Sequence, residues 1–110
     1  KYWNRALSLH PGNQQLRYEI GLAYLRSGSP EEAIPFLDQV SKEAEEATLR
    51  SQAFTLRGYT GVVMGASGEA EKAYQSAIEA WPSNLMAIKG LAHLMSDLER
   101  FEESRELFKQ

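Results

Sequence analysis

A run of glycines between residues 58 and 68 is the part of the sequence that most resembles a ligand-binding loop. Gly58, Gly61, Gly65 and Gly68 lie close together, and such spacing is typical of loops whose backbone N–H groups hold phosphate. A phosphate loop needs a preceding strand, and a P-loop also needs Gly-Lys-Ser or Gly-Lys-Thr. Neither occurs here, so we interpret these glycines as packing and turn positions.

Metal binding and nucleophilic catalysis have few candidate residues. The sequence contains two histidines, His10 and His93, and no cysteine. Asp97 follows His93 by four residues and would share its helix face, but no further side chain completes a recognised metal-binding set. No serine has the sequence context of a hydrolase nucleophile. We therefore expect no catalytic residue, no metal and no cofactor, and predict that the protein is not an enzyme.

Three acidic pairs have the residue types that general acid–base catalysis uses. They are Glu31-Glu32, Glu45-Glu46 and Glu102-Glu103. The first and third pairs fall in the expected first turns of helices, where the helix dipole favours negative charge. A role at helix starts therefore explains them better than paired catalytic carboxylates.

Composition excludes other classes of function. The chain has 110 residues, which fit one domain, and its 12 basic and 15 acidic residues give a net charge of -3. A nucleic-acid-binding domain normally carries a concentrated basic stripe, and none appears. No apolar run approaches the roughly 20 residues that cross a bilayer. We expect a soluble protein with no nucleic-acid partner and no membrane insertion, and the lack of cysteine fits the cytoplasm and the bacterial periplasm equally.

The elements that would position a site follow from a repeated pattern. Four bulky residues recur at spacings of 34, 37 and 34: Trp3, Leu37, Tyr74 and Phe108. Smaller residues accompany them at fixed offsets: Ala6, Val40 and Ala77 three positions later, and Ala33, Ala70 and Ser104 four positions earlier. Apolar residues recur at helical spacing, without the alternation of a strand. A period in the thirties predicts stacked helical hairpins, an all-α solenoid that favours binding over catalysis.

Turn signals divide this single domain, residues 1–110, into four units. We predict the end of a preceding repeat at 1–13, complete repeats at 14–50 and 51–84, and a truncated repeat at 85–110. Gly28 and the segment 65–68 are the expected turns of the complete hairpins, and 98–100 is the expected third turn. A capping box is predicted from Ser29 to Glu32.

The two remaining predictions concern helix lengths and faces. Three additional residues lengthen the middle period, and the charged segment 42–47 supplies them. This segment favours helix and is expected to extend one by about a turn. On the last expected first helix, the inward residues are predicted to be Ile88, Leu91, Ala92 and Met95.

These residues resemble the tetratricopeptide repeat (TPR) family. Its pattern of small and bulky positions is matched in the first complete repeat by Gly21, Tyr24, Gly28, Ala33, Leu37 and Val40, and in the second by Gly58, Ala70, Tyr74, Ala77 and Pro82. The resemblance implies a right-handed superhelix of antiparallel helix pairs, whose first helices line a concave groove. Arg57 and Gly61 depart from the pattern, since a large apolar residue and a tyrosine are usual there, and this predicts looser packing in the middle repeat.

The resemblance also implies that peptides or partner helices bind in the groove. Carried over position by position, the expected groove residues are Tyr18, Leu22, Leu25, Arg26, Gln52, Thr55, Tyr59, Val62, Val63, Lys89 and His93. Several are apolar, and exposed apolar patches mark interaction sites. Members of the family that clamp a chaperone's C-terminal carboxylate use Lys, Asn and Arg, where this chain has Tyr18, Leu22, Leu56, Met86 and Gly90. No such clamp is expected.

We predict a non-catalytic protein–protein interaction scaffold that forms part of a larger bacterial multi-repeat protein. One alternative is self-assembly into a homo-oligomer, because uncapped end repeats expose faces that normally stack on a neighbour. A further alternative is RNA binding by a related helical repeat, which would need more basic residues along the first helices of the hairpins.

Overall fold

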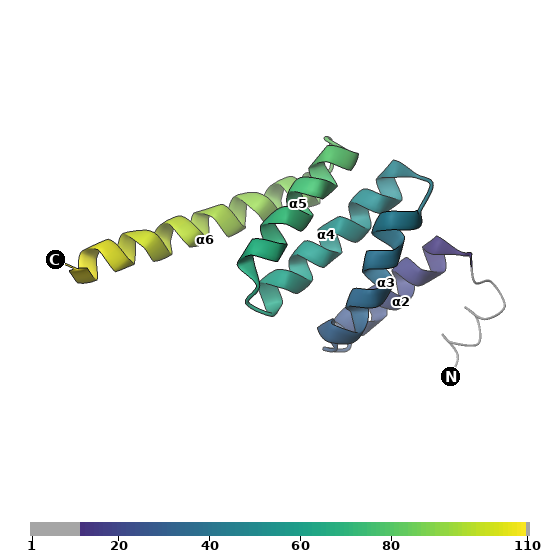
Figure 1. Ribbon diagram of the computed structural model, residues 1–110, viewed down its shortest axis with the longest axis horizontal. Helices are drawn as coiled ribbons and strands as arrows, with labels where there is room; N and C mark the ends of the chain where they lie inside the picture. The colour runs from purple at the N-terminus through teal and green to yellow at the C-terminus, as the bar shows by residue number, and fades with distance from the viewer. Residues whose placement is uncertain (1–11, 110) are drawn as a thin grey trace.

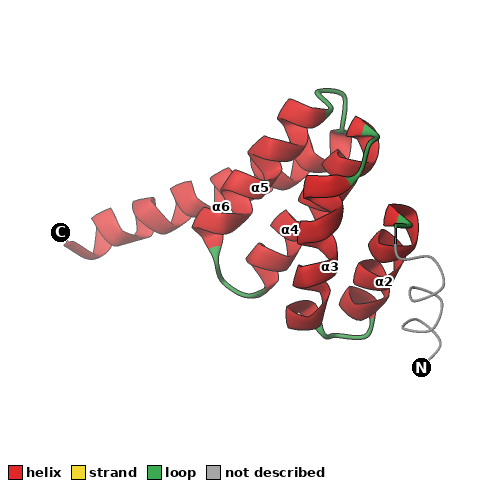
Figure 2. Cartoon of the chain, turned by 45° about the vertical axis from the view of Figure 1, so that its right-hand side comes forward, coloured by secondary structure: helices red, strands yellow, loops and turns green. Residues whose placement is uncertain are grey.

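The protein is a row of antiparallel α-helices (Figure 1). The computed structural model describes residues 12–109 and the side chains of residues 12–97, so the expected end of a preceding repeat at 1–13 lies almost entirely outside them. Within this range the helices are α2 (Gln14–Arg26), α3 (Pro30–Glu43), α4 (Ala47–Val63), α5 (Ser67–Ala80) and α6 (Leu85–Lys109). Short loops join them, and no strand occurs among the described residues (Figure 2). The prediction of an all-α fold is confirmed.

The helices form an inner and an outer layer. Each helix packs against the next, and α4 also contacts α2 and α6, whereas α3 and α5 do not contact each other within the described residues. The helices α2, α4 and α6 are therefore closer together, which places them on the inner side of a curved row. The molecule is elongated, measuring 61 × 29 × 16 Å. We call α2, α4 and residues 85–97 of α6 the inner helices, and α3 and α5 the outer helices.

Glycine ends the inner helix of each complete hairpin. Gly28 has φ 82° and Gly65 has φ 77°, in the left-handed region that glycine enters without a Cβ penalty. Both predicted turns are confirmed. The predicted capping box is wrong, because Ser29 makes no side-chain hydrogen bond at the start of α3. Its ψ of 65° differs from the extended conformation that aims a capping hydroxyl at the first helical turn.

The repeated bulky residues are core residues that face glycines. A Cβ atom built on Gly21 would lie 2.9 Å from Leu37 Cδ2, and one built on Gly58 would lie 2.8 Å from the Tyr74 ring. Both bulky side chains are buried. The missing Cβ atoms thus allow the two helices of each hairpin to approach closely, as the sequence pattern predicts.

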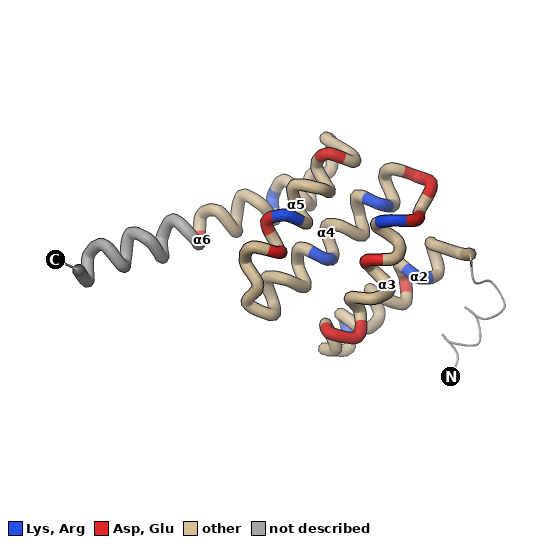
Figure 3. Tube along the Cα trace, in the orientation of Figure 1, with Lys and Arg blue, Asp and Glu red and all other residues tan. Residues whose placement is uncertain are grey.

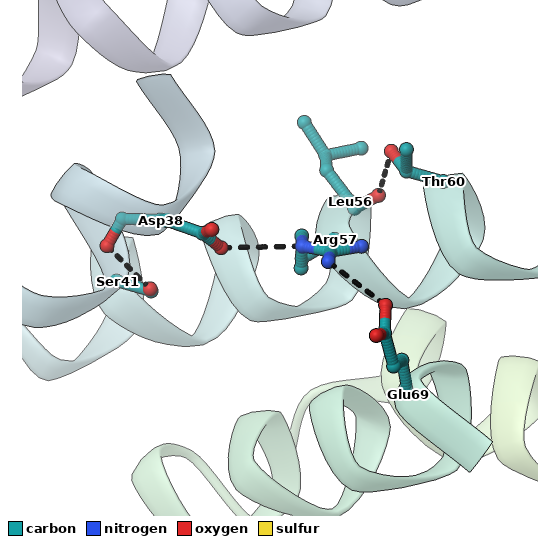
Figure 4. Close-up of polar contacts among 6 residues, drawn as sticks. All are labelled: Asp38, Ser41, Leu56, Arg57, Thr60 and Glu69. Carbon is teal, nitrogen blue, oxygen red and sulfur yellow. Dashed lines mark hydrogen bonds and ion pairs between the residues drawn. The ribbon is translucent and has the colours of Figure 1, made fainter. Parts of the chain in front are cut away.

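The middle hairpin is closely packed, which contradicts the expectation of looser packing. A Cβ atom on Gly61 would lie 3.1 Å from the Cβ of Ala70, so the lack of a tyrosine brings α5 nearer to α4. Arg57 donates hydrogen bonds to Asp38 on α3 at 3.2 Å and to Glu69 on α5 at 3.1 Å (Figure 4). One largely buried cation thus connects three helices where an apolar contact is usual. Because both carboxylates are partly exposed, each ion pair contributes modestly to stability.

The additional residues of the middle period lengthen α4. This helix begins at Ala47, about a turn before the predicted repeat boundary at residue 51, so the expected helix extension is confirmed. The segment 42–47 is nevertheless not continuous helix, because Ala44 has ψ 135° and ends α3. The Arg50 guanidinium donates to the carbonyl oxygens of Ala44 at 2.7 Å and Glu45 at 2.8 Å. The bond to Ala44 satisfies a carbonyl that the end of α3 leaves without a partner, and the bond to Glu45 fixes the following loop to α4.

The last helix differs most from expectation. Residues 98–100 lie inside α6, so the predicted turn there is wrong, and the segment contains Leu, Glu and Arg, which all favour helix. The predicted inward face is also wrong in part. Leu91 packs against the core as predicted, but Ala92 is exposed and Ile88 and Met95 are each 40% exposed. Ala87 and Leu94 are buried instead.

Both corrections have one cause. The predicted inward face is the one that a second helix of the same hairpin would cover. Among the described residues no such helix folds back on α6, which instead extends past the other helices (Figure 1). It packs against α5 and α4 of the preceding hairpin, and this contact uses the neighbouring face. Over the described residues, none of the helices combines the length and hydrophobicity that crossing a bilayer requires.

Candidate functional site

A pocket of about 360 Å³ opens between the inner helices and the loop that joins α5 to α6. Its lining comes from α2, α4, the loop 81–84 and the start of α6: Tyr18, Gln52, Thr55, Leu56, Trp81, Ser83, Asn84, Leu85 and Met86. Three of the predicted groove residues, Tyr18, Gln52 and Thr55, are thus brought together around one cavity. The inner side of the row is therefore hollowed at the point where the three inner helices begin.

An apolar strip continues from the pocket along the inner helices. Gln52 lines the pocket, and Tyr59 and Val62 follow it by seven and ten residues, which places them on the same face of α4. Tyr59, Val62 and Val63 are 52%, 44% and 54% exposed. On α2, Leu22 and Leu25 follow Tyr18 by four and seven residues and are half-buried. We call Leu22, Leu25, Tyr59, Val62 and Val63 the inner strip.

The other predicted groove residues fall into two groups. Arg26, Lys89 and His93 are exposed on the inner helices and do not line the pocket. Thr55 is buried, and its hydroxyl donates to the Ser51 carbonyl oxygen at 2.9 Å. Thr55 therefore supports the wall of the pocket and leaves its hydroxyl unavailable as a donor to a bound partner.

A buried polar network forms the wall of the pocket, and sequence reasoning missed it. The Asn84 side-chain N–H₂ donates to Ser51 Oγ at 2.8 Å and to Thr55 Oγ1 at 3.0 Å. Ser51 Oγ in turn donates to the Ala77 carbonyl oxygen at 2.6 Å. Asn84 Oδ1 accepts from the Ala87 N–H at 3.3 Å, which caps α6. One amide thus fixes the start of α6 against α4.

A sequence signal for this cap exists. Asn13 also accepts a hydrogen bond from a backbone N–H three residues later, that of Leu16 at 3.0 Å. Each of these two asparagines follows a proline by two residues, in Pro11-Gly12-Asn13 and Pro82-Ser83-Asn84. Since asparagine is among the preferred N-caps, the repeated Pro-x-Asn spacing predicts the starts of α2 and α6.

Charge is distributed unequally between the two layers (Figure 3). The outer helices carry seven acidic and two basic residues: Glu31, Glu32, Asp38, Glu43, Glu69, Glu71, Glu79, Lys42 and Lys72. The inner helices carry two acidic and five basic residues: Glu19, Asp97, Arg17, Arg26, Arg50, Arg57 and Lys89. The excess negative charge therefore lies away from the inner strip, where apolar side chains dominate.

Two tyrosines keep their protons to higher pH than usual. Burial raises the pKa of Tyr18 above its ordinary value of 10.0, against a lowering by Arg26. Burial also raises the pKa of Tyr74, and Tyr59 raises it further. Tyr18 therefore remains a neutral phenol at the pocket wall near neutral pH, and Tyr74 remains neutral inside the core.

The raised pKa of Tyr74 predicts a loss of stability at alkaline pH. Above pH 10.0 the unfolded chain releases the tyrosine proton while the folded chain retains it. The free energy of unfolding therefore falls as pH rises, until pH passes the folded-state pKa. We expect Tyr74→Phe to lose less stability than the wild type between about pH 9 and about pH 11, as measured by urea unfolding. An equal loss in both proteins would contradict the assignment to Tyr74.

Comparison with known proteins agrees with this architecture. The family model described as tetratricopeptide repeat matches residues 1–48, a range that includes α2 and α3. No curated protein gives a significant match to the chain. Within the described residues, no cluster of three or more His, Cys, Asp or Glu side chains is placed to hold a metal ion. With its helices arranged as successive antiparallel pairs, the chain is similar over residues 1–48 to the tetratricopeptide repeat family.

Proposed function

We propose that this protein is a non-catalytic scaffold that binds an amphipathic segment of another protein along its inner helices. Tetratricopeptide repeats generally mediate protein–protein interactions, and the family is generally non-catalytic. The observation that carries the proposal is the continuity of the pocket with the inner strip. Together they give a concave, largely apolar path on the side of the molecule away from most of its acidic residues.

The inner strip has the properties of a binding surface. Tyr59 and Val63 are each more than half exposed, although they lie on a helix fixed by close packing against α5. A rigid apolar surface loses little conformational freedom when a partner covers it, so more of the interaction energy appears as affinity. Tyrosine is also enriched among the residues that dominate binding at protein interfaces. Tyr59 is therefore the residue of the strip that we expect to contribute most.

The effect of Tyr59→Glu on peptide binding tests this proposal. Peptides would be selected from a random library of helix-forming and extended sequences on the immobilised wild-type protein, and their affinities measured by calorimetry. We expect Tyr59→Glu to weaken binding at least about tenfold, because a carboxylate would replace a central aromatic contact and lose water on binding.

The matched control is Gln75→Glu, which adds the same charge at an exposed position on the outer helix α5. This variant should bind the selected peptides as the wild type does, and both variants should unfold at similar urea concentrations. The proposal fails if the library yields no binder, or if the selected peptides bind the Tyr59→Glu variant with the same affinity as the wild type.

Self-assembly is a second candidate, supported by the open face of α6. Ile88 and Met95 are each 40% exposed on a face that no described element covers. If two copies associate through this face, light scattering should show a dimer that Ile88→Asp dissociates and Tyr59→Glu leaves intact. A monomer at all concentrations would exclude this mode of association.

A further inference from the structure

We infer that the pocket selects one uncharged, bulky apolar side chain as the anchor of the bound segment. This inference rests on the proposed function, because it names the part of the partner that the inner helices hold. The pocket differs from the inner strip in being a recess whose lining comes from four elements, α2, α4, the loop 81–84 and α6, although it remains open to solvent. A recess contacts a side chain from more directions than a flat strip does, so it discriminates better between side chains.

The lining of the pocket favours an uncharged occupant. None of the described residues that line it carries a charge near neutral pH. A carboxylate or ammonium group that entered would lose part of its hydration without gaining an opposite charge from the lining, which is unfavourable. Arg26 and Lys89 lie on the inner helices but are absent from the lining, although the charge of Arg26 acts on the Tyr18 hydroxyl.

The donors of the buried network behind the pocket are already used, and the other polar side chains of the lining belong to Tyr18, Gln52, Trp81 and Ser83. Both N–H groups of the Asn84 amide bond to Ser51 and Thr55, and the two hydroxyls donate to backbone carbonyl oxygens. A polar side chain that contacts the network finds no free donor there, whereas an apolar side chain loses no hydrogen bond at that contact. The network thus supports the pocket without offering a donor, and the apolar lining residues Leu56, Leu85 and Met86 favour an apolar side chain.

The rim consists of large apolar side chains that an occupant would cover. Leu85 and Met86 are 65% and 71% exposed, and Trp81 is half-buried beside them. Methionine adapts its shape to its neighbours, which suits a rim that closes around a side chain. The volume of about 360 Å³ is at the lower end of the range for ligand pockets. It therefore fits a side chain of the size of leucine or phenylalanine better than an extended ligand.

Trp81 provides a direct measurement of occupancy. The sequence has two tryptophans, Trp3 and Trp81, so the variant Trp3→Phe leaves Trp81 as the single indole fluorophore. The probes are the N-acetyl amides of phenylalanine, leucine, aspartate and lysine. We expect the phenylalanine and leucine amides to change Trp81 fluorescence with dissociation constants on the order of millimolar. The aspartate and lysine amides should bind at least about tenfold more weakly.

A pocket-filling variant and its control locate the binding. Gln52→Phe introduces an aromatic ring at an exposed residue that lines the pocket, and Gln75→Phe introduces the same ring on α5, outside it. We expect Gln52→Phe to abolish the fluorescence response and Gln75→Phe to retain it. Equal binding of charged and apolar amides, or a response unchanged by Gln52→Phe, would overturn the inference.

The two proposals fail in different ways. If selected peptides lose affinity for the Tyr59→Glu variant but not for the Gln52→Phe variant, they bind the inner strip. The inference that the pocket holds an anchoring side chain is then refuted. If the apolar amides occupy the pocket selectively while the library yields no peptide, the selectivity of the pocket stands and the proposed scaffold function falls.

Discussion

Replacing Tyr74 by alanine is expected to lower the free energy of unfolding by about 3–5 kcal/mol. The side chain is 5% exposed, and its ring lies between two helices that both lack a Cβ atom at the contact. A Cβ on Gly58 of α4 would lie 2.8 Å from the ring, and one on Gly90 of α6 would lie 2.5 Å from it. Tyr74 thus joins its own hairpin to the next inner helix. Urea unfolding followed by circular dichroism measures the loss.

Two further variants test whether the stability comes from the packing of the Tyr74 ring or from its hydroxyl group. Tyr74→Phe keeps the packed ring and should cost less than about 1.5 kcal/mol. Gly90→Ala places a methyl group against the ring, which Gly58 prevents from moving away, so it should destabilise by about 1–3 kcal/mol despite the better helix propensity of alanine. In the Tyr74→Ala background that penalty should disappear, because the ring is gone. A Tyr74→Ala loss below about 1 kcal/mol would contradict this view of the core.

The periodicity of the sequence predicted most of this core. Leu37 and Tyr74 occupy the same position in successive repeats, and both are buried against a glycine of the preceding helix. Such contacts depend on residues at fixed separations within one hairpin. A repeated pair of a small and a bulky residue therefore encodes them locally, and the turns marked by Gly28 and Gly65 follow from the same pattern.

Contacts that depend on the next repeat were predicted less well. The inward face of α6 was assigned from the pattern of complete hairpins, in which a second helix covers Ile88 and Met95. In the structure α6 contacts the preceding pair only, and it buries Ala87 and Leu94 instead. An inner helix has one face for its own hairpin and another for the preceding one, and the amphipathic pattern does not distinguish which of them is occupied.

The candidate site was predicted in outline and missed in detail. Tyr18, Gln52 and Thr55, which were predicted to share one surface, lie around one pocket, because helical spacing alone determines which residues share a face. The pocket wall also includes Trp81 and Asn84 from a loop, and a loop's position depends on tertiary contacts. Thr55 was expected at an exposed groove position and is buried, since its partner Asn84 lies 29 residues away.

Asn84→Ala is expected to lower the free energy of unfolding by about 2–4 kcal/mol. The loss of the N-cap of α6 accounts for about 1 kcal/mol. The loss of the bonds to Ser51 and Thr55 adds about 0.5–1.5 kcal/mol for each, because both hydroxyls are buried. Since Asn84 fixes the start of α6 against α4, the variant should also weaken the binding of the phenylalanine amide to the pocket. Urea unfolding and Trp81 fluorescence measure the two effects.

Asn13→Ala is the matched control, because Asn13 has the same capping role at the start of α2 without the buried network. Its side chain accepts the Leu16 N–H at 3.0 Å, and the residue is exposed. This variant should cost about 0.5–1 kcal/mol, the value of an isolated cap. The difference between the two asparagines therefore measures the network itself. If both variants cost the same, the bonds from Asn84 to Ser51 and Thr55 add no stability, and the pocket wall must be held by apolar packing alone.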